Sequence, residues 1–164
     1  MFEGFAEQAR CNLAMSAVAT NKKAYHNYHI LDKWECGIAL IGPEVKSIRA
    51  GNVSFADSFA HMDGEEVFLY HLHINPYEQA SYNNAEPDRV RKLLLHKKEI
   101  ERIKGLLTRK GLTLVPTKIY FNNRGLLKVE LGLAEGKKLY DKRADIKKKQ
   151  VNREIDRAVK NQKR

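Results

Sequence analysis

Two histidines on one predicted strand are the first residues whose spacing suggests chemistry. His71 and His73 lie two positions apart in EVFLYHLHI, residues 66–74. Alternate residues of a strand point to the same face, so both imidazoles are available to one zinc ion. No third ligand is evident, and two surface histidines that face a partner explain the pattern as well. His26 and His29, three positions apart, fall on opposite faces of a strand. We predict no metal site and no cofactor.

Acid–base pairs are the second possibility. Asp57 stands beside Ser58, and Glu44 stands two residues before Lys46. Such pairs are more often structural than catalytic. The phosphate-binding patterns GxxxxGK[ST] and GxGxxG and the nucleophile pattern GxSxG do not occur in the sequence. The residue patterns therefore point to no catalytic side chain.

Nucleic-acid binding is the chemistry that the residue types favour most. Cations neutralise phosphates, and aromatic faces stack on unpaired bases. One basic cluster lies between a polar loop and a helical segment: Arg89, Arg91, Lys92, Lys97 and Lys98. A second precedes the first predicted strand: Asn21, Lys22 and Lys23. Aromatic residues are interspersed: Tyr25, Tyr28, Trp34, Tyr77, Tyr82 and Tyr120. Solvated lysines and core aromatics are the alternative interpretation for each residue taken singly.

The distribution of charge strengthens the nucleic-acid interpretation. The chain has 164 residues and a formal net charge of +10. Residues 136–164 alone hold twelve Lys or Arg and four Asp or Glu, a net charge of +8. A basic tail of this kind is typical of contact with a polyanion, nucleic acid first and an anionic membrane surface second. The composition does not distinguish RNA from DNA.

The cysteines and the N-terminus favour a cytoplasmic protein. Cys11 and Cys36 make no disulfide framework, which suits a reducing compartment. No apolar run approaches the ~18 residues that span a bilayer. Residues 1–20 lack the basic start and continuous apolar segment of a signal peptide. We interpret them as a poorly ordered or weakly helical extension, and the body as a monomer.

The elements that must position these residues form a predicted order β-β-α-β-β-α-β-β. This order indicates a small antiparallel sheet or barrel with helices packed on it. In the hairpin, alternation predicts that Phe68, Tyr70, Leu72 and Ile74 share one face, opposite Val67, Leu69, His71 and His73. In the last strand, Leu127, Val129, Leu131 and Leu133 share a face, opposed by Lys128 and Glu130. The predicted segments are strands 25–32 and 34–41, helix 43–51, a hairpin of 54–62 and 66–74, loop 75–90, helix 92–111, and a hairpin of 112–121 and 125–133.

Beyond Gly136 the apolar pattern thins to about one residue per turn. Ile146, Val151, Ile155 and Val159 stand among charged residues. A lone helix this polar is marginal in water. We predict three parts: the extension 1–20, a body 21–133, and a tail 134–164 that is unstructured when free and helical when docked on an anionic partner.

Several strings resemble one family in order and spacing. They are NKKAYHNY (21–28), WECGIALIGPEVKSIRAG (34–51), DSFAHMDGEEVFLYHLHINPYEQ (57–79), RKLLLHKKEI (91–100), GLTLVPTKIYF (111–121) and KVELGLAEGKKLYDKRADIK (128–147). The family is the bacterial SsrA-binding protein, or small protein B. The resemblance runs from about Asn21 to the end of the chain.

The resemblance implies a mainly β fold: a small closed antiparallel barrel like the oligonucleotide/oligosaccharide-binding (OB) fold, two to three short helices and a basic tail. It implies a non-catalytic factor that binds the tRNA-like domain of transfer-messenger RNA. With that RNA the family enters stalled ribosomes, where the unfinished peptide is tagged and the ribosome released. The tail is expected in the empty mRNA channel near the decoding centre.

Carried over by position, the resemblance assigns two groups of residues. The RNA-binding group is Asn21, Lys22, Lys23, His26, Glu35, Lys46, Arg49, Arg91, Lys92 and Leu94. The ribosome-acting group is Gly136, Lys137, Lys138, Tyr140, Asp141, Lys142, Arg143, Ile146 and Lys147. Glu35 is acidic and is expected to accept a hydrogen bond from a base edge or ribose.

The sequence departs from the family pattern at two positions. Tyr140 stands where many members have His, and Tyr25 where a basic residue is common, so a charge-based role is in doubt at both. Two other classes of function stay open: an RNA-modifying or nucleolytic enzyme, and a generic barrel that coats single-stranded nucleic acid.

Overall fold

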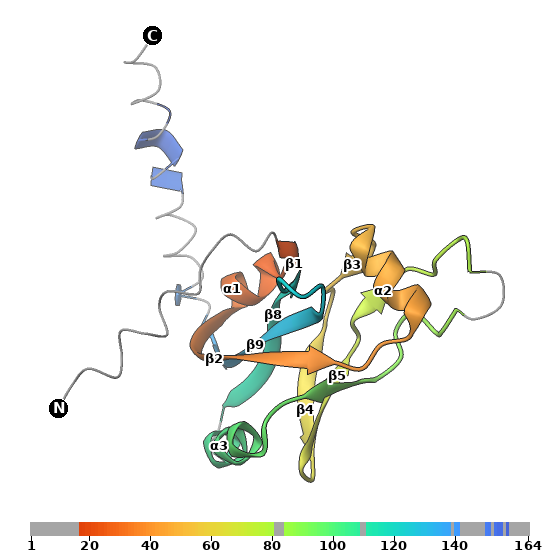
Figure 1. The fold of residues 1–164 in the computed structure, drawn as a ribbon. Helices are drawn as coiled ribbons and strands as arrows, with labels where there is room; N and C mark the ends of the chain where they lie inside the picture. The colour runs from red at the N-terminus through yellow and green to blue at the C-terminus, as the bar shows by residue number, and fades with distance from the viewer. Residues whose placement is uncertain are drawn as a thin grey trace.

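A computed structural model describes residues 17–80, 84–108, 111–138, 140–141, 150–151, 153–155 and 157. The chain is mainly β, as predicted, and three helices are assigned in the described residues between 17 and 138. Figure 1 shows the elements around the sheet. In chain order they are β1 (Ala17–Thr20), α1 (Lys22–Asn27), β2 (Tyr28–Ile38), α2 (Gly42–Arg49), β3 (Val53–Ser54), β4 (Phe59–Asp63), β5 (Glu66–Tyr70), β6 (His73–Ile74), β7 (Arg91–Leu94), α3 (Lys97–Leu107), β8 (Leu112–Phe121) and β9 (Leu127–Gly136).

The main sheet closes into a ring. Its strand order is β1-β8-β4-β5-β7-β2-β9, and β8 also pairs with β9, so six antiparallel strands form a circuit with β1 added beside β8. The ring is weakest between β4 and β8, which are in register only at Ala60 and Leu114. Helix α1 packs on β8 and β2, α2 on β6, and α3 on β8 at one end of the ring (Figure 1).

The core lies inside this ring. Alternate residues of β9 point inward, and Val129, Leu131 and Leu133 are at most 2% exposed, which confirms their predicted face. Trp34 of β2 is buried opposite Leu131. Ile48 and Ile103, from α2 and α3, are fully buried in the same cluster. Both helices therefore contribute apolar side chains to the core.

The prediction of two strands over 25–32 and 34–41 was wrong. The Asn21 side chain accepts a hydrogen bond from the Ala24 N–H at 3.0 Å and caps α1, so the chain is helical up to Asn27. One strand then runs from Tyr28 to Ile38, and its register with β9 shifts between Ile30 and Asp32. A buried capping side chain overrides the β preference of the aromatic residues in this segment.

The predicted helix 92–111 begins too early. Arg91–Leu94 is strand β7, which pairs with β5 and β2 and completes the ring, and α3 starts at Lys97. The Glu99 carboxylate accepts the His96 N–H at 2.9 Å and fixes this later start. Leu93 and Leu94 therefore belong to the sheet, and Leu95 lies between β7 and α3.

The predicted alternation in 66–74 fails at His71. Val67 and Leu69 are buried, but so are Leu72 and Ile74, which the alternation placed on the opposite face. His71 has a φ of 52°, in the left-handed region. A strand cannot continue through this conformation, so the side-chain order changes phase between β5 and β6.

The strand pairing extends beyond the predicted body of 21–133. Residues 17–20, assigned above to the extension, form β1 and pair with β8. At the other end, β9 continues to Gly136 beside Tyr28, and the Lys137 N–H donates to the Asn27 carbonyl at 2.9 Å. The structure therefore runs as one body at least from Ala17 to Lys137, whereas residues 1–16 lie outside the described ranges.

Candidate nucleic-acid interface

The outer surface of β2, β9 and β8 carries a row of charged and aromatic side chains, called here the β2–β9–β8 face. It exists because the buried residues Trp34, Val129 and Ile119 alternate with outward neighbours on each strand. Across the strands, Glu35 is in register with Glu130, and Lys128 with Tyr120. The residues of the face are Lys33, Glu35, Lys118, Tyr120, Lys128 and Glu130.

The two opposed carboxylates of this face are kept ionised by separate partners. Glu130 accepts hydrogen bonds from Lys33 at 3.0 Å and from the Thr117 hydroxyl at 2.6 Å. Burial alone would raise the pKa of Glu130, but these donors hold that pKa below its ordinary value. Lys33 also lies over the ring of Tyr25, 5.3 Å from its centroid.

Glu35 lies in the same row, and part of its carboxylate is open to solvent. It accepts a hydrogen bond from the Tyr120 hydroxyl and lies 3.1 Å from Lys128 Nζ. The hydrogen bond from Tyr120 is the main reason that the pKa of Glu35 lies below its ordinary value, and partial burial opposes it. The Glu35 side chain remains 49% exposed, so an ionised acceptor is presented to solvent.

A groove beside Glu35 brings together two predicted RNA-binding residues that are 59 positions apart in the chain. Glu35 and Leu94 both line it, with Lys128 and Leu126. Its volume is about 530 Å³, and Leu94 and Leu126 are 53% and 58% exposed. Exposed leucines beside an acceptor and a cation offer apolar contact, hydrogen bonding and charge to one ligand.

Helix α1 carries exposed cations and lies beside β8 and the start of β2. Lys22 and Lys23 are exposed, and His26 is half-buried beside Asn27, with His26 Nδ1 3.1 Å from the Asn27 side-chain oxygen. Asn21, predicted to contact RNA, is 6% exposed. Its amide donates to the Pro116 carbonyl at 2.9 Å, and its N–H to Thr117 O at 2.8 Å. Asn21 therefore places α1 and the lysines and offers little surface of its own.

Replacing Asn21 by Ala is expected to lower the free energy of unfolding by about 0.5–2 kcal/mol, the usual cost of a lost N-cap. Urea unfolding of this variant and of Lys22→Ala, an exposed neighbour, measures the effect. Unchanged stability of Asn21→Ala together with lost RNA binding would contradict the structural role and place Asn21 in direct contact with RNA.

Two cations of α2 lie over aromatic rings. Lys46 Nζ is 5.6 Å from the ring centroid of Tyr77, and the Arg49 guanidinium is 5.3 Å from that of Phe121. Both cations are exposed. Each is thus held in place by a ring while its charge stays available to a phosphate.

Arg91 does not lie on the surface, contrary to its predicted role in RNA contact. It is 0% exposed, and its guanidinium contacts the Glu44 carboxylate at 2.8–2.9 Å. It also donates to the carbonyls of Leu72 at 2.6 Å, Arg89 at 2.9 Å and Pro87 at 2.9 Å. Arg91 ties the loop before β7 to α2, because all its donors are used inside the protein.

The remaining predicted residues are dispersed. Lys92 is paired with Glu66 on β5 and is partly exposed. Lys137 Nζ donates to the Tyr25 carbonyl at 2.9 Å, and the Asp141 carboxylate accepts the Lys138 N–H at 3.2 Å. Tyr140 is 81% exposed. Of the predicted tail group, Lys142, Arg143, Ile146 and Lys147 lie outside the described residues.

Beyond Lys138, the tail positions that the structure describes are helical. They are residues 140–141, 150–151, 153–155 and 157. Val151 and Ile155 are 52% and 53% exposed there. Exposed apolar side chains such as these are available for contact with a partner. That the tail becomes ordered on a partner stays a prediction.

Of the six residues of the face, the predicted RNA-binding group held only Glu35. Alternation placed Lys128 and Glu130 outward, Tyr120 was named among the interspersed aromatic residues, and Lys33 and Lys118 were given no role. Their position around Glu35 depends on pairing between β2, β9 and β8. The alternation on β9 was the one signal that pointed to Lys128.

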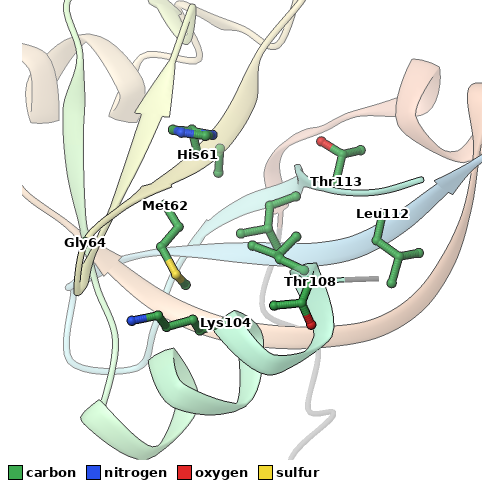
Figure 2. A pocket seen from close by; sticks show the side chains of 10 residues that line it. His61, Met62, Gly64, Lys104, Thr108, Leu112 and Thr113 are labelled. Carbon is green, nitrogen blue, oxygen red and sulfur yellow. The ribbon is translucent and has the colours of Figure 1, made fainter. Parts of the chain in front are cut away.

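A separate pocket of about 480 Å³ lies where the ring is weakly closed between β4 and β8 (Figure 2). Met62 from β4, Lys104 and Thr108 from the end of α3, and Leu112 and Thr113 from β8 line it (Figure 2). The residues predicted to bind RNA do not contribute to its lining. We therefore interpret this pocket as a gap between the weakly paired strands β4 and β8, separate from the proposed RNA surface.

The residues that the structure describes contain no group of three or more His, Cys, Asp or Glu placed to hold a metal ion. Within the same ranges, no helix is long and apolar enough to cross a membrane.

Comparison with known proteins gives one consistent match. The family model described as "SmpB protein" matches residues 18–161. The SsrA-binding protein of Syntrophobacter fumaroxidans is 59% identical over 140 residues, 85% of this chain and 86% of that protein. That of Thermosipho africanus is 53% identical over 146 residues, 89% and 98% of the two chains. A solved structure described as "tmRNA-SmpB: a journey to the center of the bacterial ribosome" is 57% identical, with a TM-score of 0.63, covering 74% of this chain and 85% of that chain.

Proposed function

Because the chain belongs to the SmpB family of SsrA-binding proteins, we propose that it binds the tRNA-like domain of transfer-messenger RNA and delivers it to stalled ribosomes for peptide tagging and ribosome release. The names of its relatives, and the match to a chain described with tmRNA and the bacterial ribosome, support this function. The protein acts by binding, in the cytoplasm, as a monomer and without a cofactor or catalytic residue.

The observation that carries the proposal is the groove beside the β2–β9–β8 face. It places the Glu35 carboxylate, the Lys128 ammonium and the exposed Leu94 around one space. Phosphates attract the lysines, while an unpaired nucleobase packs on leucine and donates to the carboxylate. Positive charge alone would bind any polyanion. The carboxylate and the leucine add contacts that only an exposed base of a folded RNA makes.

The remaining contacts extend outward from that groove. Lys22, Lys23 and His26 on α1, and Lys46 and Arg49 on α2, supply further positive charge, and Lys92 adds to it when its pair with Glu66 opens. Asn21 and Arg91 contribute by holding α1 and the loop before β7. The ring of strands serves as a barrel of the OB type, filling the place that an anticodon arm occupies in an ordinary tRNA.

The tail tests whether the mRNA channel is empty. The motif from Gly136 to Lys147, including Tyr140 and Asp141, would dock near the decoding centre of the small subunit and become an ordered helix against rRNA. Electrostatic attraction supplies affinity, and the presence of mRNA in the same space prevents docking.

Competition in filter binding tests the proposed function. The full-length protein is bound to transfer-messenger RNA, with an ordinary tRNA and an unstructured RNA of equal length as competitors. We expect strong preference for the transfer-messenger RNA. Equal competition by all three would reduce the protein to a general nucleic-acid-binding barrel.

The contribution of α1 is tested by Lys23→Gln. Removing one phosphate contact is expected to make the slope of log K against log salt shallower by about 0.9, because one fewer counterion is released. The matched control is Lys104→Gln on α3, which also removes an exposed lysine but lies outside the groups predicted to bind nucleic acid. An unchanged slope for Lys23→Gln would remove this residue from the interface.

A further inference from the structure

Tyr120 is a large, nearly buried side chain whose one polar atom reaches the proposed RNA surface. It lies on β8 and is 8% exposed. Its hydroxyl donates to Glu35 Oε2 on β2, two strands away, across the intervening strand β9. The ring packs within the sheet, and Lys118 Nζ lies 5.4 Å from its centroid. The buried Tyr120 side chain is thus hydrogen-bonded to Glu35, which lines the groove.

We propose that Tyr120 is a positioning residue for RNA recognition, which holds the Glu35 carboxylate in the orientation that accepts a hydrogen bond from a nucleobase or ribose. This inference rests on the proposed function. Nothing in the family resemblance assigned Tyr120 a role.

The geometry leaves room for a ligand on Glu35. Tyr120 occupies one lone pair of Oε2, and Lys128 Nζ lies 3.1 Å from Oε1. A carboxylate has about four acceptor positions, so each oxygen keeps one for an RNA donor. The two protein partners differ in kind. Lys128 is a flexible cation that a phosphate can draw away, whereas the Tyr120 ring is fixed by packing.

Fixing the carboxylate before RNA arrives reduces the entropic cost of binding. A glutamate on an open strand face samples several rotamers, and each immobilised side chain of this kind costs free energy on association. The hydroxyl of Tyr120 restricts those rotamers in the free protein. It therefore raises affinity without touching the RNA.

The same hydrogen bond favours the ionised state that an acceptor needs. Tyr120 donates to a carboxylate, and this lowers the pKa of Glu35. Burial and the negative charge of Glu35 together raise the pKa of the Tyr120 hydroxyl, so it stays a donor. The other charged or titratable groups around Glu35 are Lys128 and Glu130 on β9, Lys118 on β8, Lys33 on β2, and His96 and Glu99 across the groove.

The test is Tyr120→Phe, which keeps the ring and removes only the hydroxyl. We expect affinity for transfer-messenger RNA to fall about tenfold, the equivalent of one hydrogen bond. The pH profile should also move. Binding needs the ionised carboxylate, so affinity is lost as the pH falls through the pKa of Glu35. In Tyr120→Phe that pKa rises and the loss occurs at higher pH than in the wild type.

Controls separate positioning from folding. Tyr70→Phe removes a phenol hydroxyl on β5, and we expect unchanged affinity and pH profile. In the Glu35→Ala background, which removes the acceptor of the Tyr120 hydroxyl, adding Tyr120→Phe should have little further effect, because the tyrosine acts through the carboxylate. Carbon-detected NMR titration of Glu35 in the wild type and in Tyr120→Phe reads the pKa directly, whatever the effect on stability.

Two outcomes would overturn the inference: a Glu35 pKa that is the same in both proteins, or full additivity in the Glu35→Ala background. Failure of the proposed function looks different, since the wild type itself would then show no preference for transfer-messenger RNA over tRNA. A wild type with that preference and an unaffected Tyr120→Phe variant would remove only the role of Tyr120.

Discussion

Replacing Glu44 by Ala is expected to lower the free energy of unfolding by about 3–5 kcal/mol, the largest effect of any single substitution considered for this protein. The Glu44 side chain is 6% exposed and binds two arginines, Arg89 at 2.6 and 2.9 Å and Arg91 at 2.8–2.9 Å. It also accepts the Ile41 N–H at 2.9 Å at the start of α2. Its removal leaves the fully buried Arg91 without its ion-pair partner.

The dependence of this stability on pH follows from the pKa of Glu44. Burial would raise that pKa, but the hydrogen bonds from Arg89, the Ile41 N–H and Arg91 hold it below its ordinary value of 4.5. The contribution of Glu44 is therefore present above about pH 4.5, the pKa of an unfolded glutamate, and is lost as the pH falls through the lower folded value. Glu44→Ala should remove this part of the acid sensitivity.

Urea unfolding at pH 7 and at pH 4 measures both effects. The matched control is Glu66→Ala, which breaks the exposed pair with Lys92 and is expected to cost about 0–1 kcal/mol. A loss below 1 kcal/mol for Glu44→Ala would contradict the structural role of the Glu44–Arg91 pair. It would reopen a surface role for Arg91.

Truncation after Lys138 is expected to abolish tagging of stalled peptides while leaving the affinity for transfer-messenger RNA close to that of the full chain. The cut is placed there because β9 extends to Gly136 and Ala134 is fully buried, so an end at 133 would damage the sheet. The deleted residues hold ten Lys or Arg and four Asp or Glu. Their loss removes the proposed contact with the mRNA channel and none of the groove.

Tagging is measured in a reconstituted translation reaction on a message without a stop codon, beside filter binding of the RNA. The control keeps the length and composition of residues 139–164 but shuffles their order. We expect the shuffled tail to fail as well, because it keeps the charge but loses the spacing of apolar residues. Normal tagging by the truncated protein would rule out the tail mechanism, and rescue by the shuffled tail would reduce it to charge alone.

The sequence predicted those parts of the fold in which pattern and local geometry agree. The hairpin of β8 and β9 and helix α2 appear as expected, since period-two alternation in one and Pro43 at the first turn of the other are strong local signals. The sequence misplaced the segments that long-range contacts decide. Arg91–Leu94 looks helical in isolation and becomes β7 because the ring needs a strand between β5 and β2.

The candidate site shows the same division between residues that local signals indicate and residues that long-range contacts determine. Residue type pointed to Lys22 and Lys23, the family resemblance added Lys46 and Arg49, and all four are exposed. Neither approach distinguished Arg91 from them, because burial of this arginine depends on an acid 47 positions away. Lys128 and Tyr120 gain their importance only from the neighbours that strand pairing gives them. Residue type reports chemistry, and topology decides where that chemistry is available.

The pairing of β2 with β9 also determines when the body can form during synthesis. Trp34 lies opposite Leu131, about 100 residues later in the chain. At about 5–20 residues per second, β2 therefore waits roughly 5–20 s for its partner. Throughout that time the edge of β2 that pairs with β9 stays unpaired, and the other edge also stays unpaired until β7 has been made. The nascent chain is thus exposed to misassociation through β2 until β9 has been synthesised. Only the tail is synthesised after β9.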